Sequence, residues 1–200
     1  MVSPRPASID EIALIHNRDY IFRIADVAKK GGGWLDPDTV TSSGSYESAL
    51  YAAGGAIKAI ESVLNKETDQ VFALVRPPGH HAVRQWSMGF CLFNNIAIAA
   101  RYAVKQYQLE RIAIIDFDVH HGNGTQEAFY DDPQVLYVST HESPFYPGTG
   151  GREEIGVGQA EGTTINIPLP SGCSDHEYLQ AFHQIVAPVV RRFSPQLILV

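Results

Sequence analysis

The sequence predicts an α/β fold in which a mostly parallel central sheet carries helices on both faces. Two observations support this fold class. Amphipathic helical segments alternate along the chain with short, continuously apolar segments, and an unbroken apolar run is typical of a strand buried on both faces. With 200 residues, no internal repeat and no low-complexity linker, we expect a single domain over residues 1–200.

The predicted helices are marked by caps and by apolar residues at helical spacing. Ser8 begins a capping box, and Ser174 begins a second one. Ser45 is expected to cap a further helix, and Pro188 is expected to kink or end the last one. The helical periods run over 12–27, 50–64, 93–104 and 179–189, and a short helix is expected over 125–130.

The predicted strands are five short apolar runs between these helices. Ligands of such sheets bind beyond the carboxyl ends of the strands, so the loops after the first three runs are expected to carry the site. A Gly-rich break and a polar loop are expected over 31–45. The five runs are Val71–Val75, Arg111–Phe117, Val135–Thr140, Thr163–Pro168 and Leu197–Val200.

Composition excludes several classes of protein. Fifteen basic and 22 acidic residues give a net charge of −7, which leaves no basic footprint for a nucleic acid. Two cysteines cannot form a disulfide framework and are expected to be reduced. No secretory leader and no apolar run long enough to span a membrane is present. We therefore expect a cytoplasmic protein.

The segment 114–124, Ile-Ile-Asp-Phe-Asp-Val-His-His-Gly-Asn-Gly, carries the strongest chemical signal. If the strand stays extended, Asp116, Asp118 and His120 project to one side, because side chains alternate along a strand. Carboxylate oxygens with an imidazole nitrogen suit zinc or another divalent transition metal. Both aspartates could instead cap the helix that follows, but capping does not explain two acids together with a histidine pair.

A second histidine pair, His80 and His81, follows the first predicted strand in a loop stiffened by two prolines. Imidazoles beside a metal suit general-base and electrostatic roles, because their ordinary pKa lies near ~6.5. The loops 87–95 and 141–150 place aromatic residues between glycines and prolines, and we expect them to form the walls of a narrow apolar channel.

Four motifs together resemble the histone deacetylase family, including its bacterial relatives and the acetylpolyamine amidohydrolases. In order they are RPPGHHA (76–82), MGFCLFNN (88–95), DFDVHHGNGTQ (116–126) and FYPGTG (145–150). The resemblance implies a three-layer α/β/α fold of the arginase and deacetylase type. It also implies zinc-dependent removal of acetyl groups from a lysine peptide or an acetylated polyamine, with Fe2+ as an alternative metal.

The resemblance also implies roles for individual residues. It makes His81 the general base and His80 its electrostatic support, with Asp116 orienting His80 and Asn123 orienting His81. The implied ligands of the catalytic metal are Asp118 and His120. The implied walls of the substrate tunnel are Gly89, Phe90 and Tyr146. The implied ligands of a structural K+ ion are Asp116, Asp118, His120, Ser139 and Thr140.

Two features of the family pattern fall outside these 200 residues, namely a third metal ligand and a catalytic tyrosine. We therefore expect a domain truncated at both ends and, for the 200-residue chain alone, weak or no activity. One alternative is a non-catalytic domain that binds acyl-lysine or a protein partner. Another is a ureohydrolase with two metals, although Gly122 stands where a further carboxylate ligand is needed. The oligomeric state is not readable from the sequence.

Overall fold

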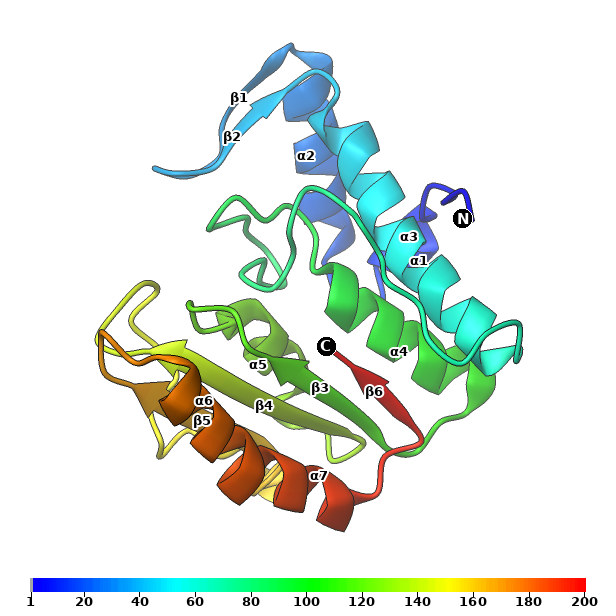
Figure 1. Cartoon of the computed structure of the whole chain (residues 1–200). Helices are drawn as coiled ribbons and strands as arrows, with labels where there is room; N and C mark the ends of the chain where they lie inside the picture. The colour runs from blue at the N-terminus through cyan, green and yellow to red at the C-terminus, as the bar shows by residue number, and fades with distance from the viewer. Residues whose placement is uncertain (1) are drawn as a thin grey trace. The chain divides into compact units, whose positions relative to one another are not determined.

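The computed structural model describes residues 2–200, and the chain divides into two compact units, residues 1–108 and 109–200 (Figure 1). The expected single domain over 1–200 stays a prediction. Among the described residues, no helix combines the length and apolar character needed to cross a membrane.

The first unit is mainly helical, and its long helix α3 (Ser45–Leu64) packs against α4 (Asn95–Tyr107). The predicted run over 12–27 is two helices, α1 (Ile9–Ile12) and α2 (Arg18–Lys29). The capping box at Ser8 is confirmed, because its hydroxyl accepts the N–H of Glu11 at 3.2 Å and the Glu11 carboxylate accepts the N–H of Ser8 at 2.7 Å. The core of the unit includes the buried side chains of Ile21, Ile24, Ile57, Ile60, Phe93 and Ile98.

The segment before α3 differs from the sequence prediction. A two-stranded antiparallel hairpin, β1 (Gly32–Trp34) and β2 (Val40–Ser42), occupies part of the expected loop. Ser45 is the first residue of α3 rather than its cap. Its hydroxyl accepts the N–H of Ser42 at 2.9 Å, so the side chain secures the end of β2 instead of the helix N-terminus.

The predicted strand Val71–Val75 is wrong. Its residues form no strand, and the side chains of Phe72 and Leu74 are 83% and 85% exposed. A strand needs a neighbouring strand that pairs with its N–H and C=O groups, and no described residue pairs with this segment. The apolar run therefore indicated a segment with a tendency to be buried, but it did not indicate whether a neighbouring strand would pair with that segment.

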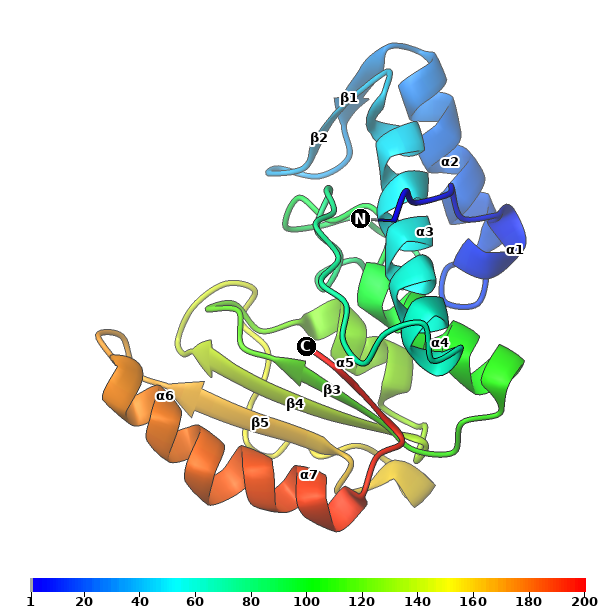
Figure 2. The same ribbon diagram turned by 45° about the vertical axis from the view of Figure 1, so that its right-hand side comes forward.

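The second unit contains a parallel sheet in the order β5–β4–β3–β6 (Figure 2). Four of the five predicted strands are thus confirmed. In the register of β3 and β4, Asp116 lies opposite Ser139. The strands are β3 (Ile112–Asp116), β4 (Val135–Glu142), β5 (Thr164–Leu169) and β6 (Leu197–Leu199).

Helices cover both faces of this sheet, which gives the unit three layers (Figures 1 and 2). One face packs against α6 (Asp175–Ala181), η2 (Phe182–Val186) and α7 (Ala187–Phe193) through an apolar cluster that includes Leu136, Val138 and Val186. The other face meets α5 (Asn123–Phe129). A 3-10 turn, η1 (Gly158–Ala160), precedes β5. The predicted α/β/α fold class is confirmed.

Two details of the helices bear on the predictions. Ser174 caps α6 in the expected capping box. Pro188 does not end the helix, which continues to Phe193. The preceding turn, η2, is a π-helix, and a wider turn is one way to accommodate a proline without an N–H inside a helix.

Candidate active site

The carboxyl end of β3 brings Asp118 and His120 together. The strand stops at Asp116, and residues 118–120 form a bend rather than the expected extended continuation. In this bend the Asp118 carboxylate accepts the N–H of His120 at 2.8 Å, and Oδ1 of Asp118 lies 3.0 Å from Nδ1 of His120. Both side chains are partly exposed, at 49% and 35%.

This pair has the donor chemistry of a transition-metal site. A carboxylate oxygen and an imidazole nitrogen are both zinc ligands, but a catalytic zinc takes three protein ligands. Among residues 2–200, no cluster of three or more His, Cys, Asp or Glu side chains has the geometry of a metal site. The described residues therefore supply two of the three protein ligands that a catalytic zinc site needs.

Two aromatic rings enclose His120. The ring of Phe145 stacks on the imidazole with centroids 5.0 Å apart and an angle of 15°. The ring of Tyr146 meets the same imidazole edge-on at 6.0 Å. The predicted tunnel residue Tyr146 thus lies beside the predicted metal ligand. The neighbouring Phe145 was not assigned a role from the sequence, although its place in the same motif is the signal that could have found it.

The expected K+ ligands at the end of β4 separate onto two faces. Ser139 faces the α5 side with Asp116, its register partner, and with Tyr137, whose hydroxyl donates to Oδ2 of Asp116 at 3.3 Å. Thr140 faces the opposite side, because side chains alternate along a strand. Its buried Oγ1 has no hydrogen-bond partner in the described part of the chain. The side chains of Ser139 and Thr140 therefore lie on opposite faces of the sheet.

Asn123 is the first residue of α5, directly after the histidine pair of the second unit. Its backbone N–H donates to the carbonyl of His121 at 2.9 Å. This turn folds His121 inward, where it is 1% exposed. Burial lowers the pKa of His121 to about 4, with a further contribution from the nearby ring of His141. The two histidines of the pair therefore have different environments, since His120 reaches solvent.

His80 and His81 lie together in the first unit. Their ring centroids are 4.0 Å apart, and His81 is buried while His80 is half-buried. The turn needs Gly79, because a Cβ atom there would lie 2.5 Å from the backbone nitrogen of Asn95. Gly89 needs its small size for the same reason, since its Cβ would lie 2.2 Å from Cδ2 of His81.

The predicted tunnel residues Gly89 and Phe90 form a tight turn with φ values of 56° and 65°. Two side chains pin this turn: Asp38 accepts the N–H of Gly89 at 3.3 Å, and the Thr39 hydroxyl accepts the N–H of Phe90 at 3.1 Å. Phe90, which this turn carries, is 64% exposed. Asp38 and Thr39 were not predicted as site residues, because their partners lie 51 residues away along the chain.

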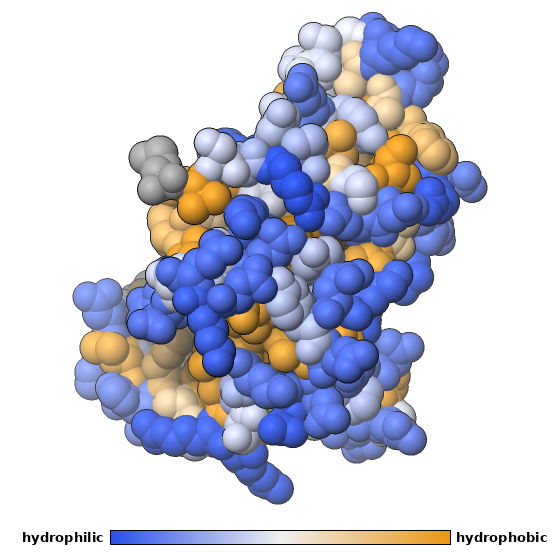
Figure 3. Space-filling view, turned by 90° about the vertical axis from the view of Figure 1, so that its right-hand side faces the viewer, coloured by the Kyte–Doolittle hydropathy of each residue, from blue (hydrophilic) through white to orange (hydrophobic). Residues whose placement is uncertain are grey.

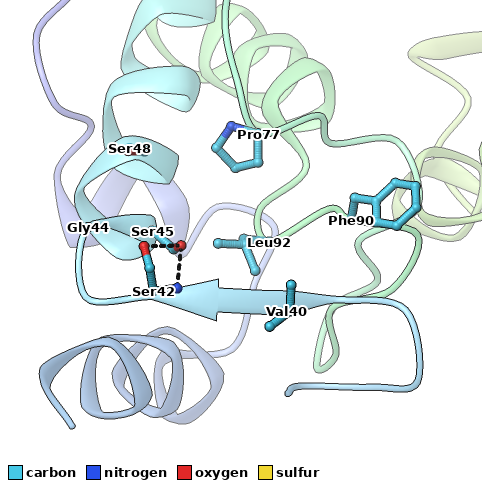
Figure 4. Close-up of a pocket in the computed structure, with 8 residues that line it drawn as sticks. All are labelled: Val40, Ser42, Gly44, Ser45, Ser48, Pro77, Phe90 and Leu92. Atoms are coloured by element: carbon cyan, nitrogen blue, oxygen red, sulfur yellow. Dashed lines mark hydrogen bonds between the residues drawn. The ribbon is translucent and has the colours of Figure 1, made fainter. Parts of the chain in front are cut away.

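Phe90 also borders a cavity of about 190 Å³ in the first unit (Figure 4). One wall of this pocket is apolar and the other carries serine hydroxyls. Ser42 and Ser45 are hydrogen-bonded to each other at the polar end of this pocket. The lining residues are Val40, Ser42, Gly44, Ser45, Ser48, Pro77, Phe90 and Leu92.

Comparison with known proteins places this geometry in a family. The model of the histone deacetylase domain matches residues 1–200. A probable deacetylase of Archaeoglobus fulgidus is 48% identical over 99% of this chain and 55% of its own length. Histone deacetylase 10 (chloroplastic) of Oryza sativa subsp. japonica is 46% identical over 98% of this chain and 47% of its own length.

The fold is shared with a solved structure. The crystal structure of the HDA15 HD domain superposes with a TM-score of 0.95 at 35% identity, and the match covers 98% of this chain and 56% of that one. The chain thus spans about half the length of the curated relatives that it matches.

Proposed function

This chain belongs to the histone deacetylase family. From that premise we propose that it is the catalytic part of a metal-dependent amide hydrolase, which removes acetyl groups from lysine side chains or polyamines. The observation that carries the proposal is the pairing of Asp118 Oδ1 with His120 Nδ1 at 3.0 Å. Two metal-type donors meet there at the carboxyl end of a parallel strand, where such sheets bind their ligands.

Asp118 and His120 would hold the metal, with Zn2+ as the proposed ion and Fe2+ as the alternative. When bound, the ion polarises the substrate carbonyl and lowers the pKa of a coordinated water molecule. The described residues supply two donors, so the proposal requires a third from elsewhere in the protein. Two donors alone are expected to bind the ion weakly.

In the proposed reaction His81 is the general base that takes a proton from the attacking water. His80, whose ring lies beside it, supports the charge that His81 acquires. Asp116 and Asn123 are proposed to orient His80 and His81, as the family resemblance implies. The proton then passes to the departing amine, and the products are acetate and a free amino group.

Gly89, Phe90 and Tyr146 are the proposed grip on the aliphatic stem of the substrate. The exposure of Phe90 supports this role, because covering an exposed aromatic ring with a methylene chain removes apolar surface from water and lowers the free energy of the complex. A structural K+ ion is proposed at Asp116, Asp118, His120, Ser139 and Thr140, as the family resemblance implies. Gly89 packs tightly on His81, so the proposed substrate-binding turn lies in contact with the proposed general base.

The experiment uses the full-length protein that carries this chain. Acetate release would be measured with an acetylated lysine peptide and with an acetylated polyamine, before and after removal and restoration of zinc. We expect zinc-dependent release that His81→Ala abolishes while the bound zinc content stays unchanged. Near-normal kcat in His81→Ala would overturn the assignment of the base, and no zinc dependence would overturn the metal.

A non-catalytic binding domain is the second candidate. The exposure of Phe90 favours it, because Asp38 and Thr39 fix the backbone of the turn that carries this side chain, and the ring can cover an acyl-lysine stem without any metal. This candidate predicts tight binding of an acetylated peptide without acetate release in the full-length protein.

We also propose a cytoplasmic location, in keeping with two free cysteines. A rice relative is named as chloroplastic, so cell fractionation is the direct test. Recovery of the protein in an organelle fraction would overturn this location.

A further inference from the structure

A partly buried polar network in the second unit consists of residues to which the proposed function assigns no role. It lies on the α5 face of the sheet and links α5, β5 and the loop after β4. Each member has a polar partner within hydrogen-bond distance. The members are His121, Gln126, Thr149, Glu154 and Asn166.

Glu154 is the acidic end of this network. Its Oε1 accepts the N–H groups of Gly150 and Gly151 at 3.1 and 2.9 Å, and its Oε2 accepts a hydrogen bond from Nε2 of Gln126. Burial alone would raise the pKa of Glu154, but these hydrogen bonds outweigh burial and leave the pKa below its ordinary value. The group is therefore an ionised carboxylate, which only accepts hydrogen bonds.

The carboxylate fixes the direction of the bonds through Gln126 and His121, while the backbone carbonyl of Glu154 accepts a hydrogen bond from Nδ2 of Asn166 at 3.2 Å. Since the amide nitrogen of Gln126 faces Glu154, its Oε1 faces the other way, where it accepts a hydrogen bond from Nδ2 of Asn166 at 2.7 Å. Nε2 of His121 lies 3.0 Å from the same oxygen and must carry the ring hydrogen. Nδ1 of His121 is then the acceptor for the Thr149 hydroxyl at 2.7 Å.

The same residues hold the base of the loop over 143–148. Thr149 is bonded to His121, while Gly150 and Gly151 are bonded to Glu154. The carbonyl oxygen of Gly150 also lies 3.1 Å from Nε2 of His141, and a Cβ atom at this glycine would lie 2.5 Å from that nitrogen. The loop that carries Tyr146 therefore ends at a fixed turn.

We propose that Glu154 is a positioning residue that sets the tautomer of His121 through Gln126 and fixes the turn from which Tyr146 reaches the side of His120. The tautomer part of this inference concerns the chain alone. The part concerning Tyr146 rests on the proposed function, in which this ring grips the substrate.

The test is ¹⁵N NMR of the His121 ring in four proteins: the unsubstituted chain, Glu154→Gln, a doubly substituted rescue and a control. In the unsubstituted chain we expect the hydrogen on Nε2. In Glu154→Gln the single amide oxygen is needed by Gly150 and Gly151, so the new NH2 faces Gln126 and forces that amide to turn around. Its nitrogen then faces both His121, whose hydrogen moves to Nδ1, and Asn166, whose amide turns so that its otherwise unpartnered Oδ1 accepts the new hydrogen bond.

A swapped pair provides the rescue. In Glu154→Gln with Gln126→Glu the carboxylate has moved one position along the network. It then accepts hydrogen bonds both from the amide introduced at position 154 and from Nε2–H of His121, so the hydrogen returns to Nε2. Glu153→Gln is the matched control, because it removes the same charge from an exposed neighbour. We expect no change of tautomer there.

In the full-length enzyme we expect Glu154→Gln to raise KM at least threefold with kcat within twofold, and the swapped pair to restore KM. Nδ1–H in the unsubstituted chain, or an unchanged tautomer in Glu154→Gln, overturns the proposal. A changed tautomer with unchanged KM overturns the link to Tyr146. If Glu154→Gln does not fold, the unsubstituted chain and the swapped pair still decide, since both must show Nε2–H. Absence of activity in the unsubstituted enzyme would count against the proposed function and leave the NMR result intact.

Discussion

The ring of Phe145 lies flat on the imidazole of His120, with centroids 5.0 Å apart and planes inclined by 15°. The stacked ring limits the orientations of an imidazole whose Nδ1 is directed at Asp118. A metal ion that uses this pair gains from a ligand already held in place, because less rotamer freedom is lost on binding.

Replacing Phe145 should therefore weaken metal binding. An aromatic pair contributes about 0.5–1.5 kcal/mol beyond the area it buries, so we expect Phe145→Ala to lower the affinity for zinc by about two- to tenfold. Phe145→Tyr keeps the ring and is the control, with affinity unchanged. Competition with a chromophoric zinc chelator measures both, and equal affinity of Phe145→Ala and the unsubstituted chain would contradict this role.

A buried histidine in the first unit should make stability depend on pH. Nδ1–H of His16 donates to the carbonyl of Val83 at 3.0 Å, and Nε2 accepts the N–H of Asn94 at 2.9 Å, so the ring is neutral. Burial lowers the pKa of His16 from 6.5 to about 4. The unfolded chain therefore binds the proton first, and its stability relative to the folded state rises as the pH falls from about 6.5 toward 4.

For His16 alone this linkage amounts to a loss of about 2 kcal/mol in the free energy of unfolding between pH 7.5 and pH 5. His16→Gln keeps one donor and one acceptor but does not titrate, so urea unfolding of this variant should lose about 2 kcal/mol less over the same range. His121 leaves a remaining pH dependence in both proteins, because its pKa is also lowered to about 4. Identical pH profiles for the two proteins would show that His16 is not the group responsible.

The exposed segment over 71–75 should promote self-association. Phe72 and Leu74 are more than four-fifths exposed, and extended apolar segments without a pairing partner are aggregation-prone. Hydrophobic residues are open to solvent among hydrophilic ones on the face shown in Figure 3. We expect Phe72→Ser with Leu74→Ser to reduce light scattering and dye binding at high concentration without lowering the free energy of unfolding. A loss of stability above about 1 kcal/mol would instead show that these side chains are packed in solution.

The segment over 71–75 shows which structural features the sequence can predict and which it cannot. Continuous apolar runs correctly located β3, β4, β5 and β6, because each has a neighbour that satisfies its backbone groups. The same pattern failed at Val71–Val75, because hydrophobicity reports a tendency to be buried and contains no information about the pairing strand. The hairpin of β1 and β2 was missed for the converse reason, since its residues are mostly polar or glycine.

The candidate site shows a similar limit. Asp118 and His120, which are two residues apart, were expected on one side of an extended strand, and they do meet, although in a bend. Partners that are far apart along the chain, such as Asp38 with Gly89 or Gln126 with Glu154, were not predicted. Their juxtaposition depends on loop paths, for which the side-chain pattern of one sequence contains no signal.

The final prediction concerns Gly54, where α3 meets the N-terminal segment. A Cβ atom at this position would lie 1.8 Å from the carbonyl oxygen of Arg5 and 2.7 Å from the backbone nitrogen of Ala7. Alanine is favoured over glycine inside a helix by about 1 kcal/mol, but here the backbone of the crossing segment would have to move, and the N–H of Ala7 would lose its 2.9 Å bond to the carbonyl of Leu50. Overpacking of this kind typically costs about 1–3 kcal/mol or more.

We therefore expect Gly54→Ala to lower the free energy of unfolding by about 2 kcal/mol, measured by urea denaturation. Gly44→Ala is the matched control, because that glycine precedes the same helix and has nothing within 4 Å of the added Cβ atom. Its effect should stay below about 1 kcal/mol. If Gly54→Ala were stabilising, helix propensity would outweigh the clash, and the N-terminal segment would have to lie farther from α3 in solution than the 1.8 Å approach to Arg5 implies.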